Sequence, residues 1–137
     1  MAVRYDTVYL NIDQIKEAHE KYSMDTMEFL EWITAGQIND AMISQLSKCI
    51  ANKAIGSIIS ALGVVLNVID LIEKIIDGIE ADKYKEMLDQ MKAYGGIGAM
   101  KVEIATVYER VYDPGTDTSY IKIYDHYVRK FVYGRNY

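Results

Sequence analysis

The middle of the chain carries an aliphatic pattern typical of one long helix. Residues 54–69, AIGSIISALGVVLNVI, contain no charged residue. Alternating steps of three and four, the spacing of a helix-packing seam, connect eight aliphatic positions: Ile55, Ile58, Leu62, Val65, Ile69, Ile72, Ile76 and Ile79. Acidic residues from Asp70 to Glu80 fall on the opposite side of the second half. The pattern therefore predicts a continuous apolar helix over about 54–79.

Shorter amphipathic segments flank this run. Asn11 and Gln14 have the spacing of a capping box, and Asp25 is placed to begin a second helix. A third apolar stripe with helical period follows Gln37, and another runs from Tyr84 to Met91. We expect a bundle of four to five helices over residues 11–94, arranged around the apolar central helix.

Both ends of the chain use residues that favour strands. Residues 3–10 place Val3, Tyr5, Thr7 and Tyr9 on one side of a pleat. Residues 100–133 are rich in Val, Ile, Tyr and Thr on either side of the turn sequence DPGTDT at 113–118. The sequence predicts a single α+β domain over 1–137, with a C-terminal antiparallel hairpin at 100–133. Residues 3–10 would add an edge strand, giving a three-stranded sheet.

The second arm of the hairpin has an alternative interpretation. In residues 119–133, the apolar side chains also match one face of a helix: Ile123, Tyr124, Tyr127, Val128 and Phe131. The local density of β-branched and aromatic residues favours the strand.

Composition narrows the class of protein. The chain has 137 residues, half of them hydrophobic, a net charge of −5 and one cysteine. These values exclude a disordered tail and a disulfide framework, and they argue against a general nucleic-acid coat, which needs many Lys and Arg contacts to phosphate. The N-terminal residues do not resemble a secretory signal, so we expect a cytoplasmic protein. Export without a classical signal and membrane association are the alternatives.

No motif identifies a catalytic, cofactor or metal site. His19 lies in EAHEKY, which lacks the second histidine of a zinc protease motif, and Gly95–Gly98 follow a predicted helix instead of opening one. Cys49 falls on an apolar stripe, as a buried structural cysteine would. We therefore expect no catalytic residue, cofactor or metal, with a small enzyme lacking a recognisable motif as an alternative.

The C-terminal segment combines tyrosine with basic residues. Its candidate contact residues are Tyr120, Tyr124, Tyr127, Arg129, Lys130 and Tyr133. Tyrosine and arginine are enriched where proteins meet, and the same mixture can stack on single-stranded nucleic acid. The acidic chain argues against nucleic acid, and an ordinary solvated sheet face is the third interpretation.

The amount of aliphatic surface suggests assembly. If the short helices cannot cover the seam over 54–79, the remainder would pair with another copy or another protein. We predict a non-enzymatic interaction or assembly protein, homo-oligomeric through this helix, with structural and toxin-neutralising roles in the same class.

A latent membrane-inserting toxin is the main alternative function. Such a toxin would keep the apolar helix packed against its other helices until the helix is released into a membrane. However, a helix of residues 54–69 spans about 24 Å, which is less than the roughly 30 Å of bilayer hydrocarbon, so any membrane contact would be conditional.

Overall fold

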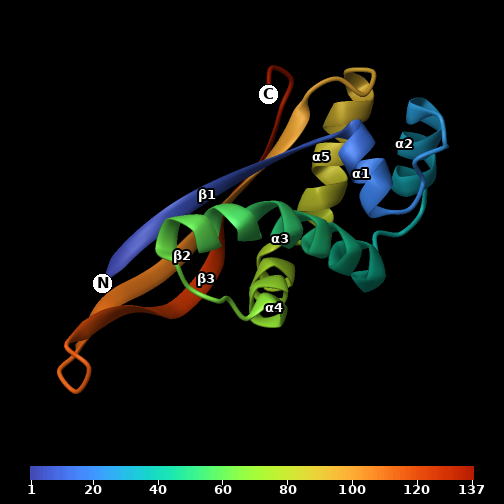
Figure 1. Ribbon diagram of the computed structural model, residues 1–137. Helices are drawn as coiled ribbons and strands as arrows, with labels where there is room; N and C mark the ends of the chain where they lie inside the picture. The colour runs from blue at the N-terminus through green and yellow to red at the C-terminus, as the bar shows by residue number, and fades with distance from the viewer.

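The structure, a computed structural model, describes residues 1–137 and contains both helices and strands (Figure 1). In chain order the elements are β1 (Ala2–Asn11), α1 (Ile12–Ala18), α2 (Thr26–Ala35), α3 (Asp40–Leu62), α4 (Val68–Gly78), α5 (Ala81–Ala93), β2 (Ala99–Asp113) and β3 (Thr118–Gly134). The expected α+β composition is confirmed.

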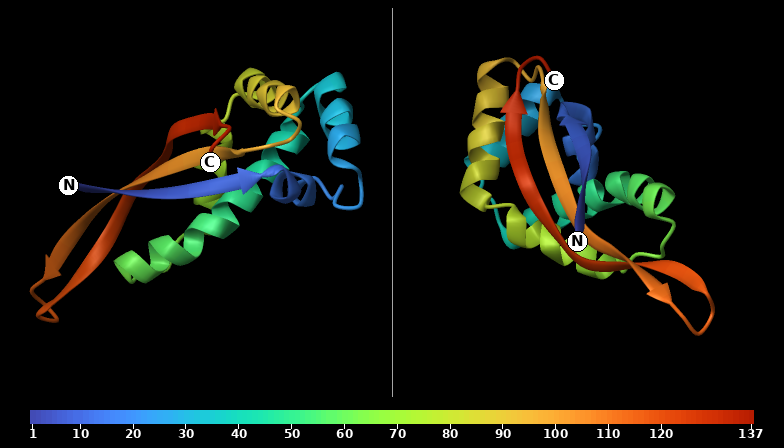
Figure 2. Two further views of the ribbon diagram at one scale, coloured as in Figure 1. Left: turned by 90° about the horizontal axis from the view of Figure 1, so that it is seen from above. Right: turned by 90° about the vertical axis from the view of Figure 1, so that its left-hand side faces the viewer.

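The three strands form one antiparallel sheet in the order β1-β2-β3. Residues 3–10 lie within the edge strand β1, and the strand interpretation of residues 119–133 is confirmed over the helical one. β1 pairs with β2 from Asn11, opposite Ala99, to Ala2, opposite Tyr108. β2 and β3 continue together beyond that point as a two-stranded arm, which projects from the body in Figures 1 and 2.

All five helices lie on one side of the sheet, as the right-hand view of Figure 2 shows. On this side Leu10, Met100 and Val102 are buried with Phe29 and Leu46 in one hydrophobic cluster. In β1 the alternate residues of the opposite side are exposed, so strand alternation separates a covered face from a bare one.

The predicted continuous helix over 54–79 is wrong. α3 ends at Leu62, and Gly63 follows in the left-handed conformation with φ +66°. A new helix then begins behind Asn67, whose side-chain oxygen accepts a hydrogen bond from the backbone N–H of Asp70 at 3.2 Å. Glycine adopts positive φ cheaply and asparagine is a good N-cap, so local backbone chemistry ended one helix and began another despite the unbroken aliphatic spacing.

A bundle around a central helix does not form either. α3 packs against β1, α1 and α4, while α4 lies on β3 and α5 on α2 and β3. The sheet accounts for this difference, because its covered face offers apolar surface to several helices at once. The helices therefore form a layer on the sheet.

The approach of α4 to β3 depends on a glycine. A Cβ added at Gly78 would lie 2.7 Å from both Cβ and Cγ2 of Val128. Such distances are well inside van der Waals contact, so the absence of a side chain permits this close contact between helix and strand.

Candidate interaction surfaces

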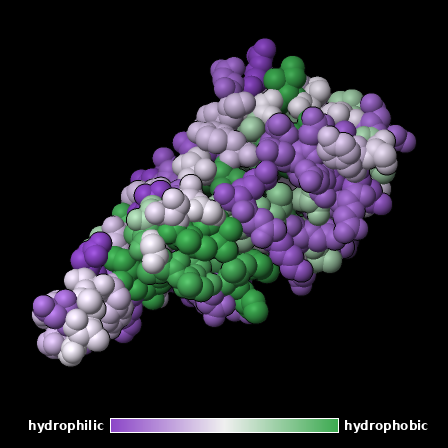
Figure 3. Space-filling model, viewed as in Figure 1, coloured by the Kyte–Doolittle hydropathy of each residue, from purple (hydrophilic) through white to green (hydrophobic).

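An uncovered apolar surface lies where α3 gives way to α4. We define the α3–α4 patch as Ile55, Ile59, Leu62, Val64, Val65 and Ile69. Val65 is 97% exposed, Ile69 69% and Ile59 39%, and the other three are half-buried. Figure 3, drawn in the orientation of Figure 1, shows a continuous hydrophobic area over the C-terminal half of α3 and the segment that follows it.

The eight predicted seam residues do not share one environment. Ile58 and Ile79 are buried in the chain's own core. Ile55, Leu62, Ile72 and Ile76 are half-buried, and Val65 and Ile69 are exposed. The change of direction between the two helices therefore splits the seam into a part that stabilises the fold and a part that faces solvent.

The six side chains of the α3–α4 patch are uncharged, and Asp70 and Lys122 border the patch beside Val64 and Val65. Between Lys53 and Asp70 the chain has no ionisable side chain, and the polar groups along this stretch are serine hydroxyls and one asparagine. Most apolar surface on a protein is interrupted by charged residues, and large contiguous exceptions mark contact sites.

A second bare surface is the side of the sheet away from the helices. We define the outer sheet face as Val3, Tyr5, Thr7, Tyr9, Glu103, Tyr127, Arg129 and Lys130. Tyr5, Tyr9 and Tyr127 are each between 40 and 50% exposed. The guanidinium carbon of Arg129 lies 4.8 Å from the centre of the Tyr5 ring, so a cation–π contact joins the two outer strands across β2.

A buried carboxylate holds the Arg129 guanidinium in this position. Glu103 on β2 is only 8% exposed and accepts a hydrogen bond from the Arg129 guanidinium. That bond holds the pKa of Glu103 below its ordinary value and raises the pKa of Arg129. Arg129 is also the extra residue at a bulge, since Glu103 pairs with Lys130 and Ile104 with Val128.

The six predicted C-terminal contact residues do not all share a surface. Tyr127, Arg129 and Lys130 lie together on the outer sheet face. Tyr120 and Tyr124 belong to the projecting arm, where the Tyr124 hydroxyl donates to Glu109 at 2.7 Å. Tyr133 is half-buried and donates to the carbonyl oxygen of Ile97.

Five members of the outer sheet face, among them Tyr5 and Tyr9, were missing from the predicted contact residues. Tyr5 and Tyr9 come from β1, far from the C-terminal segment in sequence. Their alternation with Val3 and Thr7 signalled a common side, but only the strand order brings that side next to Arg129.

A small polar network surrounds His19 in the interior. Its Nδ1 is 3.3 Å from Oε1 of Gln45 and its Nε2 is 2.8 Å from the Tyr84 hydroxyl. Because Oε1 can only accept, Nδ1 carries the proton and Nε2 accepts from Tyr84. Burial lowers the pKa of His19 and raises that of Tyr84. The network therefore holds neutral groups that stabilise the core.

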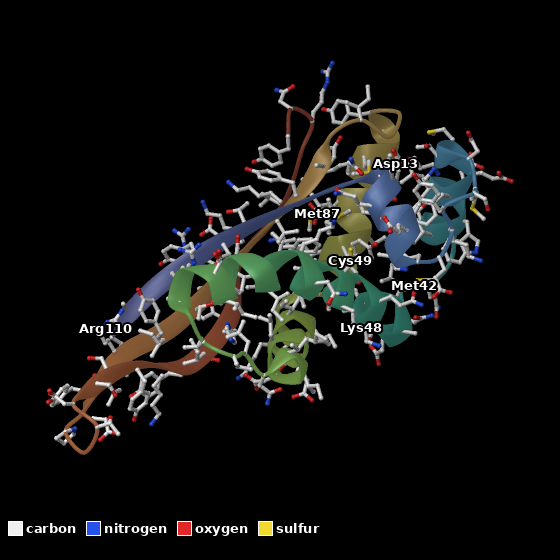
Figure 4. The ribbon with its side chains drawn as sticks, in the orientation of Figure 1. Asp13, Met42, Lys48, Cys49, Met87 and Arg110 are labelled. Atoms are coloured by element: carbon white, nitrogen blue, oxygen red, sulfur yellow. The ribbon has the colours of Figure 1, made fainter.

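The single cysteine, labelled in Figure 4 with its neighbour Lys48, helps to line a polar groove between α1 and α3 together with Glu17, Glu20, Lys48 and Lys53. Cys49 is half-buried, and burial raises the pKa of its thiol, which disfavours the nucleophilic thiolate. No group of three His, Cys, Asp or Glu side chains is placed to hold a metal ion.

None of the helices combines the length and apolar character needed to cross a membrane. No family model, curated protein or solved structure matches this chain.

Proposed function

We propose that this chain is a non-enzymatic assembly module that forms homo-oligomers through the α3–α4 patch. The observation that supports this proposal is the exposure of Val65 and Ile69 beside four further aliphatic side chains. Ile59, Val65 and Ile69 are the exposed members, while Ile55, Leu62 and Val64 also pack against the chain's own core. Burial between subunits is the usual outcome for such an exposed apolar surface.

Burial of the exposed patch residues would contribute several kcal/mol to association. Full burial of a valine or isoleucine side chain contributes roughly 1.5–3 kcal/mol. In a twofold dimer each residue is counted twice, so Val65 and Ile69 alone supply several kcal/mol toward the cost of association.

The charge distribution favours a second copy as the occupant. A twofold interface places each residue near its own counterpart, so any charge close to the axis meets a like charge. The six patch residues are uncharged, so an axis that passes through them avoids this repulsion if it stays clear of Asp70 and Lys122, which line a pocket beside Val64 and Val65.

The outer sheet face supplies a contact surface for a different protein. Tyr5, Tyr9, Tyr127 and Arg129 are residue types that dominate binding energy in protein interfaces. Their ordering through Glu103 and the cation–π contact reduces the side-chain entropy lost on binding. The homo-oligomer would then present several copies of this face.

Sedimentation velocity at several protein concentrations tests the assembly. We expect wild-type protein to form oligomers and Val65→Asp to weaken the association at least tenfold. Because Val65 is almost fully exposed, the aspartate cannot disturb the folded monomer, which circular dichroism verifies. The matched control is Ile97→Asp, also at an exposed aliphatic position but outside the patch, and it should associate like wild type.

A strictly monomeric wild-type chain at high concentration would overturn the proposal, as would equal association of Val65→Asp and wild type. Dye release from anionic vesicles, measured between pH 4 and 7, examines the membrane alternative. Leakage that Val65→Asp abolishes would favour conditional membrane insertion over assembly.

A further inference from the structure

β1 is a regular edge strand whose two inward-pointing charged residues, Arg4 and Asp6, form an ion pair with each other. It runs for ten residues and pairs with β2 in an unbroken register. It contains no lysine, proline or glycine. Exposed edges of this length normally carry such residues, because unpaired backbone groups recruit further strands.

The other edge of the same sheet shows the contrast. β3 carries Lys122, Arg129 and Lys130, and two register shifts interrupt its pairing with β2. Bulges and inserted charges are the recognised means of blocking strand addition. β1 is therefore the more regular of the two edges and the one better suited to receive a strand.

We propose that β1 pairs antiparallel with β1 of a second copy, so that the two sheets become one six-stranded sheet with Tyr5 on the twofold axis. This proposal deepens the proposed function and rests on it, because it assigns the strand contact that accompanies the α3–α4 patch.

Charge complementarity selects the register. Directly opposed residues in an antiparallel pair point to the same side of the sheet. A shift of the second strand by one residue would place inward-pointing residues opposite outward-pointing ones, so only shifts by two residues are allowed. With Tyr5 opposite Tyr5 of the second copy, Arg4 lies opposite Asp6 and Asp6 opposite Arg4. The two neighbouring registers place Arg4 opposite Arg4, or Asp6 opposite Asp6, where like charges repel.

The groups that would make these pairs are already positioned. Arg4 donates to Asp6 within the chain through Nε at 3.2 Å and Nη2 at 3.0 Å. Asp6 is 6% exposed, so its carboxylate lies in a mostly dehydrated site at the sheet edge. A second Arg4 would add the opposite charge to a carboxylate that has one cationic partner.

The edge and the α3–α4 patch lie on the same side of the molecule. In Figure 1 β1 lies on the viewer's side of the β2 and β3 residues beside it, and the C-terminal end of α3 also lies toward the viewer; both views in Figure 2 show that the β2–β3 arm curves forward to this side as well. Figure 3 shows that the apolar area faces the same direction. The proposed twofold contact thus uses the side of the molecule that also carries the α3–α4 patch.

Disulfide trapping in a Cys49→Ser background tests the register, because the chain has no other cysteine. Directly opposed residues in antiparallel strands have Cα atoms about 4.5–5.5 Å apart, within the range that a disulfide spans. We expect Tyr5→Cys to form a cross-linked dimer at least tenfold faster than Tyr9→Cys. Tyr9 is the matched control, with 48% exposure against 49%, and the two copies of it would be about 27 Å apart.

A charge variant gives an independent readout. Tyr5→Glu sets two carboxylates against each other at the axis and should weaken dimerisation at least tenfold in sedimentation, while Tyr9→Glu should not. Each glutamate has a basic neighbour within the chain, Arg129 for position 5 and Lys101 for position 9. The two variants should therefore have similar stability as folded monomers.

The two proposals fail separately. Dimers of wild type that Val65→Asp disrupts, combined with equal cross-linking of Tyr5→Cys and Tyr9→Cys, would overturn the β1 pairing and leave the patch-mediated assembly standing. A monomeric wild type overturns both. Preferred cross-linking of Thr7→Cys over Tyr5→Cys would also overturn the stated register.

Discussion

The guanidinium of Arg129 lies over the ring of Tyr5, 4.8 Å from its centre, although the two residues stand at opposite ends of the chain. The contact crosses the central strand and is reinforced from below by Glu103, which bonds the same guanidinium. Three strands are therefore linked on a face that no helix covers.

Replacing Arg129 with lysine should lower the midpoint of urea unfolding. A lysine ammonium cannot lie flat on the Tyr5 ring and bond to Glu103 with a planar fork. We expect the decrease to be smaller when Tyr5 is already leucine, because the two side chains are coupled. Equal decreases in both backgrounds, measured by a double-mutant cycle, would show that the stacking contributes nothing.

Two helical glycines should respond oppositely to alanine. Gly78→Ala introduces a Cβ 2.7 Å from the Val128 side chain and should destabilise the fold by about 1–3 kcal/mol. At Gly56, on α3, nothing lies within 4 Å of an added Cβ, so Gly56→Ala should stabilise by about 0.5–1 kcal/mol. Equilibrium urea unfolding measures both. A stabilising Gly78→Ala would contradict the close packing of α4 on β3.

Stability should fall as the pH decreases from about 7 to 5.5. Burial lowers the pKa of His19 below 6.5, and burial of His126 outweighs the opposing effect of Asp70 and Asp125. Both histidines therefore bind a proton less readily in the fold than in the unfolded chain, where histidine titrates near pH 6.5. Each contributes at most about 1.4 kcal/mol per pH unit over this window.

The variant His19→Gln isolates one of these contributions. Glutamine keeps hydrogen-bonding capacity toward Tyr84 but does not titrate, so the loss of unfolding free energy between pH 7.5 and 5.5 should be smaller than in wild type. Carboxylates common to both proteins cancel in the comparison. An unchanged pH dependence would mean that His19 takes up its proton equally in the folded and unfolded states.

The sheet was predictable because its signals are local and mutually consistent. Alternation in residues 3–10 and the turn sequence at 113–118 specify strands, and both correspond to strands in the structure. The order β1-β2-β3 follows from antiparallel pairing of the first strand with the near arm of the hairpin. The bulge at Arg129 and the contact with Tyr5 were not predictable, because both depend on register.

The prediction of one helix over 54–79 is wrong because the spacing of aliphatic residues does not show where the backbone ends a helix. A seam of alternating three- and four-residue steps continues through Gly63 and Asn67, but it only describes which residues are apolar. Gly63 and Asn67 are four residues apart and together have the composition of a helix end followed by a helix start. The exposure of Val65 was not predictable from the aliphatic spacing for the same reason, because Val65 lies in the segment between Gly63 and Asn67.

That break can be tested directly at its two ends. Gly63 has φ +66°, where alanine is disfavoured by about 1–2 kcal/mol, and nothing lies within 4 Å of an added Cβ. Gly63→Ala should therefore destabilise through backbone strain alone.

Asn67→Ala removes the cap on Asp70 and should cost about 0.5–2 kcal/mol, whereas Asn67→Asp keeps a capping oxygen and should be close to wild type. If residues 54–79 formed one helix in solution, Gly63→Ala and Asn67→Ala would both stabilise the protein, since alanine has the higher helix propensity. Unfolding free energies of the three variants distinguish a broken helix from a continuous one by their sign.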